Sequence, residues 1–399
     1  MVQQEQNTKK LVEKKLPTVD ELRAQTWESI EGIVRVLMKS MFELLLDRAA
    51  GEQLGAGPYQ RTESRTGYRN GSYKRKLTSR FGTIEDLLIP RLREGTLLQS
   101  LFAPYQQRTD DVDKALGMLF LNGVSTHKIR GIAEQLIGRP VSAQTVSTIM
   151  QKTDTELEQY RAKPINDAQF EYLFLDGIHD KIREIGLERK VLLCALGLSK
   201  EGRAEILSFR LVDSESEANW TEFLVDLKQR GLKGQSLRLI TTDGNPGLRS
   251  SLKRLFPYKR HQRCIWHKMN NICMKTKKRN RKAIMGGCKD IFNAKSRHEA
   301  IKRFNVWAKH WEIEEPSAVK CLRKDLSECL SYYAIPEERW KTVRTTNILE
   351  RSFREVRRRT RPMGGTFVNP ASAERIHYNV FNLLNQNWNN RSAAFTQNS

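Results

Sequence analysis

The chain has 399 residues, of which 39% are hydrophobic and 29% charged, enough apolar material to build the cores of two or three domains. Its apolar runs fall well short of the roughly 18 residues that cross a bilayer, which excludes a membrane protein. The first 25 residues lack the apolar core of a signal peptide, so the six cysteines predict reduced thiols in a cytoplasmic protein.

Positive charge is concentrated in two segments. The chain carries a net charge of +23. Residues 251–310 hold eighteen Lys or Arg against two acids, and residues 351–362 hold six Arg against one Glu, so these segments account for +21. Aromatic residues are interleaved with the charges of the first segment. A dense basic segment on a nearly neutral body predicts a polyanionic partner, and nucleic acid is favoured over a merely solvated charged face.

The N-terminal region predicts one helix and a small sheet. Apolar residues recur at helical spacing over residues 18–48. This stripe contains Ile30, Ile33, Val34, Leu37, Met38, Met41, Phe42 and Leu45. Residues 61–105 are richer in Arg, Thr, Gly and Tyr, and alternation such as that of residues 83–90 predicts short antiparallel strands beside the helix.

Residues 110–157 predict a helix-turn-helix. Ser125 and Ser142 are each placed to cap a helix, and Gly138–Pro140 turns the chain between them. In this interpretation the second helix presents polar residues to a DNA major groove. These residues are Gln144, Ser147 and Thr148. The alternative is an ordinary compact helical pair, which would show similar starts and a similar turn.

The central region predicts an α/β domain. Strand-like runs, separated by one helix and followed by another, occur in the order 172–175, 190–196, 204–212, helix 216–230, 237–242, helix 246–255. Three consecutive strands, a helix and a fourth strand fit an RNase H-like mixed sheet. We expect Trp220 to pack in its core.

After residue 256 the chain predicts only helices up to about residue 339, with no strand-like run, and indicates an all-helical basic insertion. Residues 347–361 then predict a final helix, followed by a tail. Its apolar face carries Leu349, Phe353 and Val356, and its opposite face carries Asn347, Glu350, Arg354 and Arg357.

The predicted organisation therefore has six parts. A helical region with a possible role in oligomerisation is followed by a β-rich element, the helix-turn-helix, the first part of the catalytic core, the insertion, and the last part of the core. Their ranges are 1–60, 61–108, 109–165, 166–256, 257–342 and 343–399.

Three acids in this pattern predict a metal site. Asp176 and Asp243 would each stand at or near the exit of a buried strand, and Glu350 lies on the polar face of an Arg-rich helix. A single Asp after a strand more often caps the next helix. Together, three carboxylates on rigid elements can converge on two divalent cations roughly 4 Å apart, and their hard oxygens suit Mg²⁺ or Mn²⁺.

Five segments carry a family resemblance: residues 172–178, 209–217 with Trp220, 242–244, 262–267 and 345–361. In this order they resemble the bacterial insertion-sequence branch of the Mutator superfamily of transposases, and the similarity covers roughly residues 97–385.

The resemblance implies that Asp176, Asp243 and Glu350 form the catalytic triad of a DDE transposase with two metal ions. It implies metal-dependent hydrolysis at a transposon end, then attack of the freed 3′-OH on a phosphodiester, without a covalent enzyme intermediate. The implied partners are double-stranded DNA of the terminal inverted repeats and of the target. Joining two ends implies a homodimer or larger synaptic assembly at the bacterial nucleoid, and residues 34–46 are a candidate contact.

The Cys264-x-x-His267 pair invites a zinc interpretation, but a structural zinc site usually needs a second pair, and the sequence has none at similar spacing. The resemblance implies a structural or DNA-proximal element beside the active site. We expect Cys264 to be buried and His267 to reach Asp243 or a phosphate.

Basic residues of the insertion and of the last predicted helix are expected to contact DNA phosphates. They are Lys268, Lys275, Lys277, Lys278, Arg279, Arg351, Arg354, Arg357, Arg358 and Arg361.

Two alternative functions stay open. The first is a catalytically silent, domesticated DNA-binding protein, which would not need all three acids. The second is a structure-selective nuclease, which would cut DNA without joining it.

Overall fold

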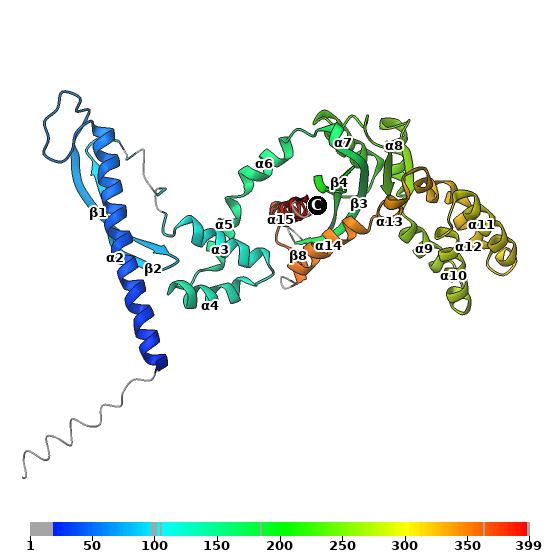
Figure 1. The fold of residues 1–399 in the computed structure, drawn as a ribbon, viewed down its shortest axis with the longest axis horizontal. Coiled ribbons are helices and arrows are strands. Elements are labelled where there is room, and N and C mark those ends of the chain that lie inside the picture. Colours follow the sequence, from blue (N-terminus) through cyan, green and yellow to red (C-terminus); the bar gives the residue numbers. More distant parts are fainter. Residues whose placement is uncertain are drawn as a thin grey trace, which may run out of the picture. The chain divides into compact units, whose positions relative to one another are not determined.

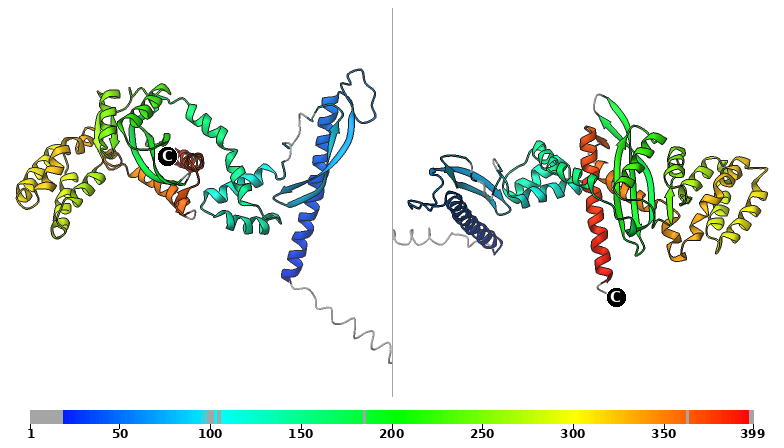
Figure 2. Two further views of the ribbon diagram at one scale, coloured as in Figure 1. Left: turned by 180° about the vertical axis from the view of Figure 1, so that it is seen from behind. Right: turned by 90° about the horizontal axis from the view of Figure 1, so that it is seen from above.

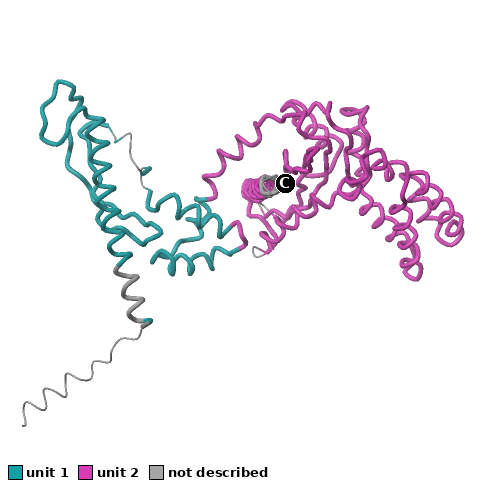
Figure 3. Tube along the Cα trace, viewed as in Figure 1, with its two compact units in different colours: residues 1–120, 124–149 teal, residues 121–123, 150–399 magenta. Residues whose placement is uncertain are grey.

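A computed structural model describes residues 19–95, 97, 102–103, 106–183, 186–361 and 364–396 (Figure 1). The chain divides into two compact units (Figure 3). Unit 1 comprises residues 1–120 and 124–149, and unit 2 comprises residues 121–123 and 150–399. Among the helices described, none combines the length and apolar character needed to cross a membrane. The finer six-part division remains a prediction.

Unit 1 begins with a long helix packed on a hairpin. Helix α2 (Val19–Leu54) lies along antiparallel strands β1 (Arg69–Ser79) and β2 (Gly82–Leu92), as Figure 2 shows. Alternating apolar residues of the hairpin meet the helix and form one buried cluster. This cluster contains Leu46, Leu77, Ile84, Leu87, Ile89 and Phe102.

Three shorter helices follow: α3 (Asp110–Leu121), α4 (Thr126–Ile137) and α5 (Ala143–Gln151). The predicted helix starts are confirmed, because Ser125 Oγ accepts from the backbone N–H of Lys128 at 3.4 Å and Ser142 Oγ accepts from that of Thr145 at 3.0 Å. Gly138 ends α4 with a φ of 68°, which favours glycine.

Unit 2 is built on a sheet whose described strands run in the order β5-β4-β3-β6-β7, with β7 (Arg260–Arg263) at one edge and β8 (Thr366–Phe367) beside the end of β3. Strands β3 (Phe170–Arg183), β4 (Leu187–Ser199) and β5 (Ala204–Val212) pair antiparallel, whereas β6 (Leu239–Thr242) runs parallel to β3. Much of β3 and β4 is continuously apolar because helices cover both faces of the sheet.

Helices α7 (Glu217–Gln229) and α8 (Pro246–Leu255) cover one face, and α15 (Pro370–Thr396) packs on β5 from the other (Figure 2). Helix α6 (Asp154–Ala162) is held to α15 by a two-pronged ion pair, in which Arg375 donates to both Asp154 oxygens at 2.6 and 2.8 Å.

In the sequence, a helical segment of unit 2 separates the strands up to residue 263 from α14 (Asn347–Thr360). Its main helices are α9 (Ile265–Met274), α10 (Arg281–Phe292), α11 (Arg297–Trp311), α12 (Pro316–Cys329) and α13 (Trp340–Val343). Three aromatic residues that are interleaved with charges in the sequence, Phe292, Phe304 and Trp307, are buried here, whereas Trp266 of α9 is half exposed.

Two predictions about this unit are wrong. The stretch after residue 256 contains a strand, β7 (Arg260–Arg263), which pairs parallel with β6. Its four residues are polar, so it has no apolar alternation to reveal it. The helix at residues 347–361 is not the last, because α15 occupies the predicted tail. Its many Asn residues favour helix weakly, but Tyr378 packs on Tyr160 of α6 and Phe381 packs on Phe209 of β5, and this burial overrides that preference.

The predicted core position of Trp220 is confirmed: its side chain is 0% exposed and packs among the residues between the sheet and α7. We expect Trp220→Ala to lower the free energy of unfolding by about 3–5 kcal/mol, because a large cavity opens in the core. Urea unfolding followed by circular dichroism measures this, with the exposed Leu136→Ala as the control. A loss below about 1 kcal/mol would contradict the packing described.

Candidate active site

Strand register brings the first two predicted acids together. The parallel pairing of β3 with β6 ends at Leu175 opposite Thr242. Asp176 follows Leu175 and Asp243 follows Thr242, so both acids lie where the paired strands separate. The expectation that Asp176 stands at a strand exit is wrong, since β3 continues to Arg183 and Asp176 pairs with Cys194 of β4. It is the shorter β6, not β3, that ends at this point.

Glu350 reaches the same place from α14. The apolar face of this helix, with Leu349, Phe353 and Val356 buried, packs beneath the sheet and contacts β3. Glu350 lies in its first turn. One carboxylate oxygen each of Asp176 and Glu350 and one ring nitrogen of His267 lie within 4.8 Å of one another. These three side chains could hold a metal ion.

Asp243 lies beside this group without belonging to it. Its Oδ1 accepts the backbone N–H of Asn245 at 2.8 Å, which turns the carboxylate toward the start of α8. Its charge nevertheless acts on the site, since it raises the pKa of Asp176. The structure therefore brings Asp176, Glu350 and His267 into direct proximity and keeps Asp243 within electrostatic range.

The carboxyl group of Asp176 is only 4% exposed. Burial, then the charges of Asp243 and Glu350, raise its pKa to about 7, against the opposing effects of His267 and the Thr346 hydroxyl. Oδ1 accepts the backbone N–H of Gly177 at 3.0 Å, while the buried Oδ2 receives no hydrogen bond of normal geometry from the described residues. A buried carboxylate in this state is costly, and a hard divalent cation would satisfy it.

The Cys264-x-x-His267 pair supports the site from α9. Cys264 is buried, and its sulfur accepts the backbone N–H of Thr346 at 3.3 Å. Thr346 Oγ1 lies 3.5 Å from His267 Nδ1, and His267 Nε2 lies 3.9 Å from Glu350 Oε1. Thr346 directly precedes α14, so the pair fixes the start of the helix that carries Glu350.

Electrostatics make His267 a cation in the metal-free protein. Burial disfavours its charged form, but the hydrogen bond to Cys264 and the charges of Cys264, Asp176 and Asp243 outweigh burial and raise its pKa to about 9. Conversely, burial opposes ionisation of the Cys264 thiol, yet its contacts with His267 lower the pKa of Cys264. An imidazolium therefore partly offsets the carboxylates.

A fourth acid, Glu215, was not predicted to take part. Its Oε2 accepts from Asn245 Nδ2 at 2.8 Å, two residues after Asp243. A Cβ at Gly177 would lie 2.6 Å from Glu215 Oε1, so the lack of a side chain at Gly177 lets this carboxylate lie against β3. Burial and the charge of Asp243 raise the pKa of Glu215. In the sequence it stands among other loop acids before a helix, and only the folded chain distinguishes it.

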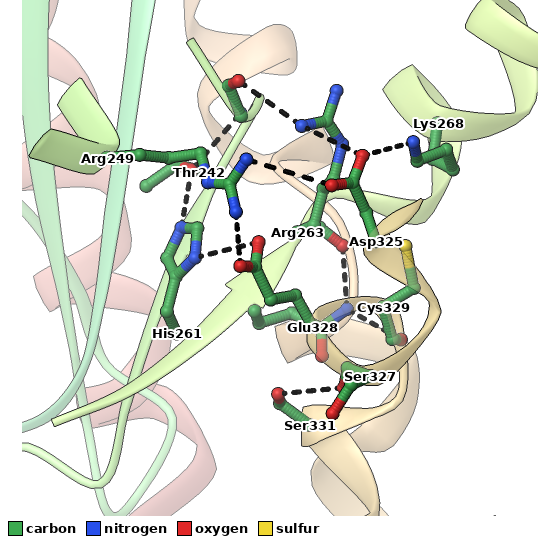
Figure 4. A network of polar contacts seen from close by, with 12 residues as sticks. Thr242, Arg249, His261, Arg263, Lys268, Asp325, Ser327, Glu328, Cys329 and Ser331 are labelled. Atoms are coloured by element: carbon green, nitrogen blue, oxygen red, sulfur yellow. Dashed lines mark hydrogen bonds and ion pairs between the residues drawn. The ribbon is translucent and has the colours of Figure 1, made fainter. Parts of the chain in front are cut away.

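A network of ion pairs holds the loop around Asp243 (Figure 4). Arg263 donates to the Gly244 carbonyl oxygen at 3.2 Å and lies 3.4 Å from Asp325 of α12. On the other side, Thr242 Oγ1 lies 2.7 Å from His261 Nε2. The network thus fixes both neighbours of Asp243 in the chain.

Two acids of α12 anchor this network. Asp325 forms ion pairs with Lys268, Arg263 and Arg249. Glu328 pairs with Arg249 and with His261. Although burial opposes it, these contacts with His261 and Arg249 lower the pKa of Glu328 to about 2. Helix α12 is therefore joined to the Asp243 loop by buried charge.

The predicted DNA-contact residues divide into two sets. Lys268 is 2% exposed, and its ammonium group donates to the Cys321 carbonyl oxygen and to Asp325, so its position argues against the predicted contact with DNA. The other predicted residues are exposed. They are Gln144, Ser147, Lys275, Lys277, Lys278, Arg279, Arg351, Arg354, Arg357, Arg358 and Arg361.

The matching family model and two similar proteins agree on the family that this chain resembles. The family model described as "Transposase, Mutator family" matches residues 9–391. The transposase for insertion sequence element ISRM5 of Rhizobium meliloti is 31% identical over 84% of this chain and 82% of its own. The transposase for insertion sequence element IS256 in transposon Tn4001 of Staphylococcus aureus is 31% identical over 90% of this chain and 91% of its own. The solved Drosophila P element transposase strand transfer complex aligns with a TM-score of 0.45 at 11% identity, over 71% of this chain and 93% of that one.

Removing the charge of Asp176 should stabilise the metal-free protein. Because folding raises its pKa from 3.8 to about 7, the folded state loses stability as pH rises through this range. In EDTA at pH 8 we expect Asp176→Asn to be more stable than the parent by up to about 4 kcal/mol, and the difference to vanish below about pH 4. Urea unfolding across pH measures this, with the exposed Asp290→Asn as the control. A variant less stable than its parent at pH 8 would contradict the electrostatics.

The Asp325 network predicts a second effect. Asp325→Asn leaves Lys268, Arg263 and Arg249 without their shared anion, so we expect the free energy of unfolding to fall by about 3–5 kcal/mol. Amide exchange at residues 242–245 should also accelerate. Glu312→Gln is the matched control, since it breaks an exposed pair with Arg323 that is worth at most about 1 kcal/mol. Unchanged exchange in the Asp243 loop would remove the proposed link.

Proposed function

Since the chain belongs to the Mutator family of transposases, we propose that it is the DNA transposase of an insertion sequence and that it cuts and joins DNA strands at Asp176, Asp243 and Glu350. The observation that carries the proposal is the buried, poorly satisfied carboxylate of Asp176, with Glu350 and Asp243 close to it. A silent DNA-binding protein would gain nothing from so costly a group.

We propose that the sheet of unit 2 is RNase H-like. In support, three antiparallel strands are followed by a parallel strand on the other side of β3, and Asp176 and Asp243 lie where β3 and β6 part. Helices α9 to α12 then constitute the insertion between Asp243 and Glu350.

The donor set suits two Mg²⁺ or Mn²⁺ ions, held by Asp176, Asp243 and Glu350. When bound, such ions activate a water or hydroxyl oxygen and stabilise charge on the phosphate and leaving oxygens. Asp176 is almost entirely shielded from bulk water, since it is only 4% exposed. His267 Nε2 lies 3.9 Å from Glu350 Oε1, so the imidazole offers a ring N–H beside the acids. It would hydrogen-bond a phosphate oxygen approaching the acids.

The exposed basic residues suggest a path for DNA. Arg351, Arg354, Arg357 and Arg358 share α14 with Glu350 and would contact phosphates of the strand leaving the site. Lys275, Lys277, Lys278 and Arg279 would add contacts from the insertion.

We assign recognition of the terminal inverted repeats to the helix-turn-helix of α4 and α5. Gln144 and Ser147 are exposed on α5, while Val146 and Ile149 are buried behind them, the division that a recognition helix requires. Joining two ends calls for two active sites, so the working form would be a homodimer or larger assembly on nucleoid DNA.

Loss of any one acid tests the proposal. Purified protein with Mg²⁺ and labelled DNA ending in the inverted repeats of its element should give nicked and joined products. Asp176→Ala, Asp243→Ala and Glu350→Ala should each abolish them and leave end binding within about twofold, because affinity comes mainly from phosphate contacts elsewhere.

Glu355→Ala is the matched control, since this acid lies on the same helix and forms an ion pair with Arg358. It should retain both reactions. A triple alanine variant that still joined DNA would show that the chemistry occurs elsewhere.

A further inference from the structure

Helix α2 has two apolar faces, of which the hairpin covers one. Leu46 is fully buried, and Met38 and Phe42 pack against the same cluster with β1 and β2. The other face remains open. Six of its large apolar side chains are 43–70% exposed: Ile30, Ile33, Val36, Leu37, Met41 and Leu44. The single stripe predicted from the sequence is thus divided between an internal contact and a free surface.

The open face forms one continuous stripe. Ile30, Ile33, Leu37, Met41 and Leu44 follow one another by three, four, four and three residues, which keeps them on one side of a helix with 3.6 residues per turn. The stripe runs for about 21 Å, at 1.5 Å per residue.

Charged residues lie off this stripe. Within residues 30–44 they recur every four positions, at Glu31, Arg35, Lys39 and Glu43. Arg35 donates to the Phe81 carbonyl oxygen at 2.8 Å, and Glu43 accepts the backbone N–H of Leu88 at 2.9 Å. This row of charges is directed toward the hairpin, so the stripe itself carries no charge.

We propose that this face binds the same face of a second copy of the chain. The six side chains expose roughly 600 Å² of apolar surface, so a symmetric pair would bury roughly 1,200 Å², the lower limit of stable protein interfaces. The spacing reads the same from either end. A two-fold antiparallel pair therefore brings each Leu37 onto its symmetry mate and Ile30 opposite Leu44, and one surface serves both copies.

The choice of a second copy of the chain as the partner of this face rests in part on the proposed function, because joining two DNA ends needs two active sites. The structure also argues against a lipid surface. A helix lying on a membrane exposes a basic face opposite its apolar face, whereas the face of α2 opposite the stripe is covered by the hairpin.

Light scattering of the full-length protein after size exclusion, over a range of concentrations, tests the interface. The parent should be a dimer. Leu37→Glu should raise the dimer dissociation constant at least about 30-fold, since the charge would be buried at the centre of the contact. Leu37→Met should stay dimeric. Leu136→Glu is the matched control, because Leu136 is similarly exposed (68% against 63%) but lies on α4; it should leave the dimer intact.

A monomeric parent at tens of micromolar, or a Leu37→Glu variant that dimerises as the parent does, would overturn the proposal. DNA assays separate this outcome from failure of the proposed function. Leu37→Glu should still nick a single labelled end but should lose the complex that holds two ends. If no variant cuts DNA, the function is wrong, while the dimer measurement still decides the interface.

Discussion

The carboxylate of Asp176 is the constraint around which the candidate active site is arranged. Asp176 lies in β3 and is only 4% exposed, and no lysine or arginine of the described residues is among the groups that shift its pKa. Its neighbours increase this cost, because Asp243 and Glu350 add negative charge. Each surrounding element positions one of these groups: β6 ends early so that Asp243 follows it, and α14 buries its apolar face so that Glu350 points toward the sheet. A fold that concentrates repulsion in this way gives up stability, as the proposed cation-binding site would require.

The basic segment of the sequence serves two different purposes. Arg263 and Lys268 are buried and, with Arg249, form ion pairs with Asp325 and so connect α12 to the loop of Asp243. Exposed lysines and arginines such as Lys275 and Arg351 remain available for phosphates. A count of charged residues in the sequence does not distinguish the buried set from the exposed set. The helical segment from α9 to α12 is therefore part of the support of the candidate site as well as the proposed surface for DNA.

Sequence patterns predicted what depends on local periodicity. The apolar runs predicted β3 to β6, and the serines at positions 125 and 142 predicted the helix starts. The polar face of α14 indicated Glu350 as a candidate residue. Features that depend on contacts between distant segments were not predicted. Strand β7 has only polar residues, α15 is held by packing rather than propensity, and Glu215 lies against β3 at Gly177, which has no side chain to exclude it. Lys268 was predicted to contact DNA because nothing in the sequence pairs it with Asp325, 57 positions away.

The central claim, that Asp176, Asp243 and Glu350 share divalent cations, is tested most directly by anomalous diffraction from crystals of the protein grown with Mn²⁺. We expect Mn²⁺ peaks bound by carboxylate oxygens of Asp176 and by those of Asp243 or Glu350. Well-ordered crystals in which Mn²⁺ binds elsewhere, while these three side chains bind none, would contradict the account.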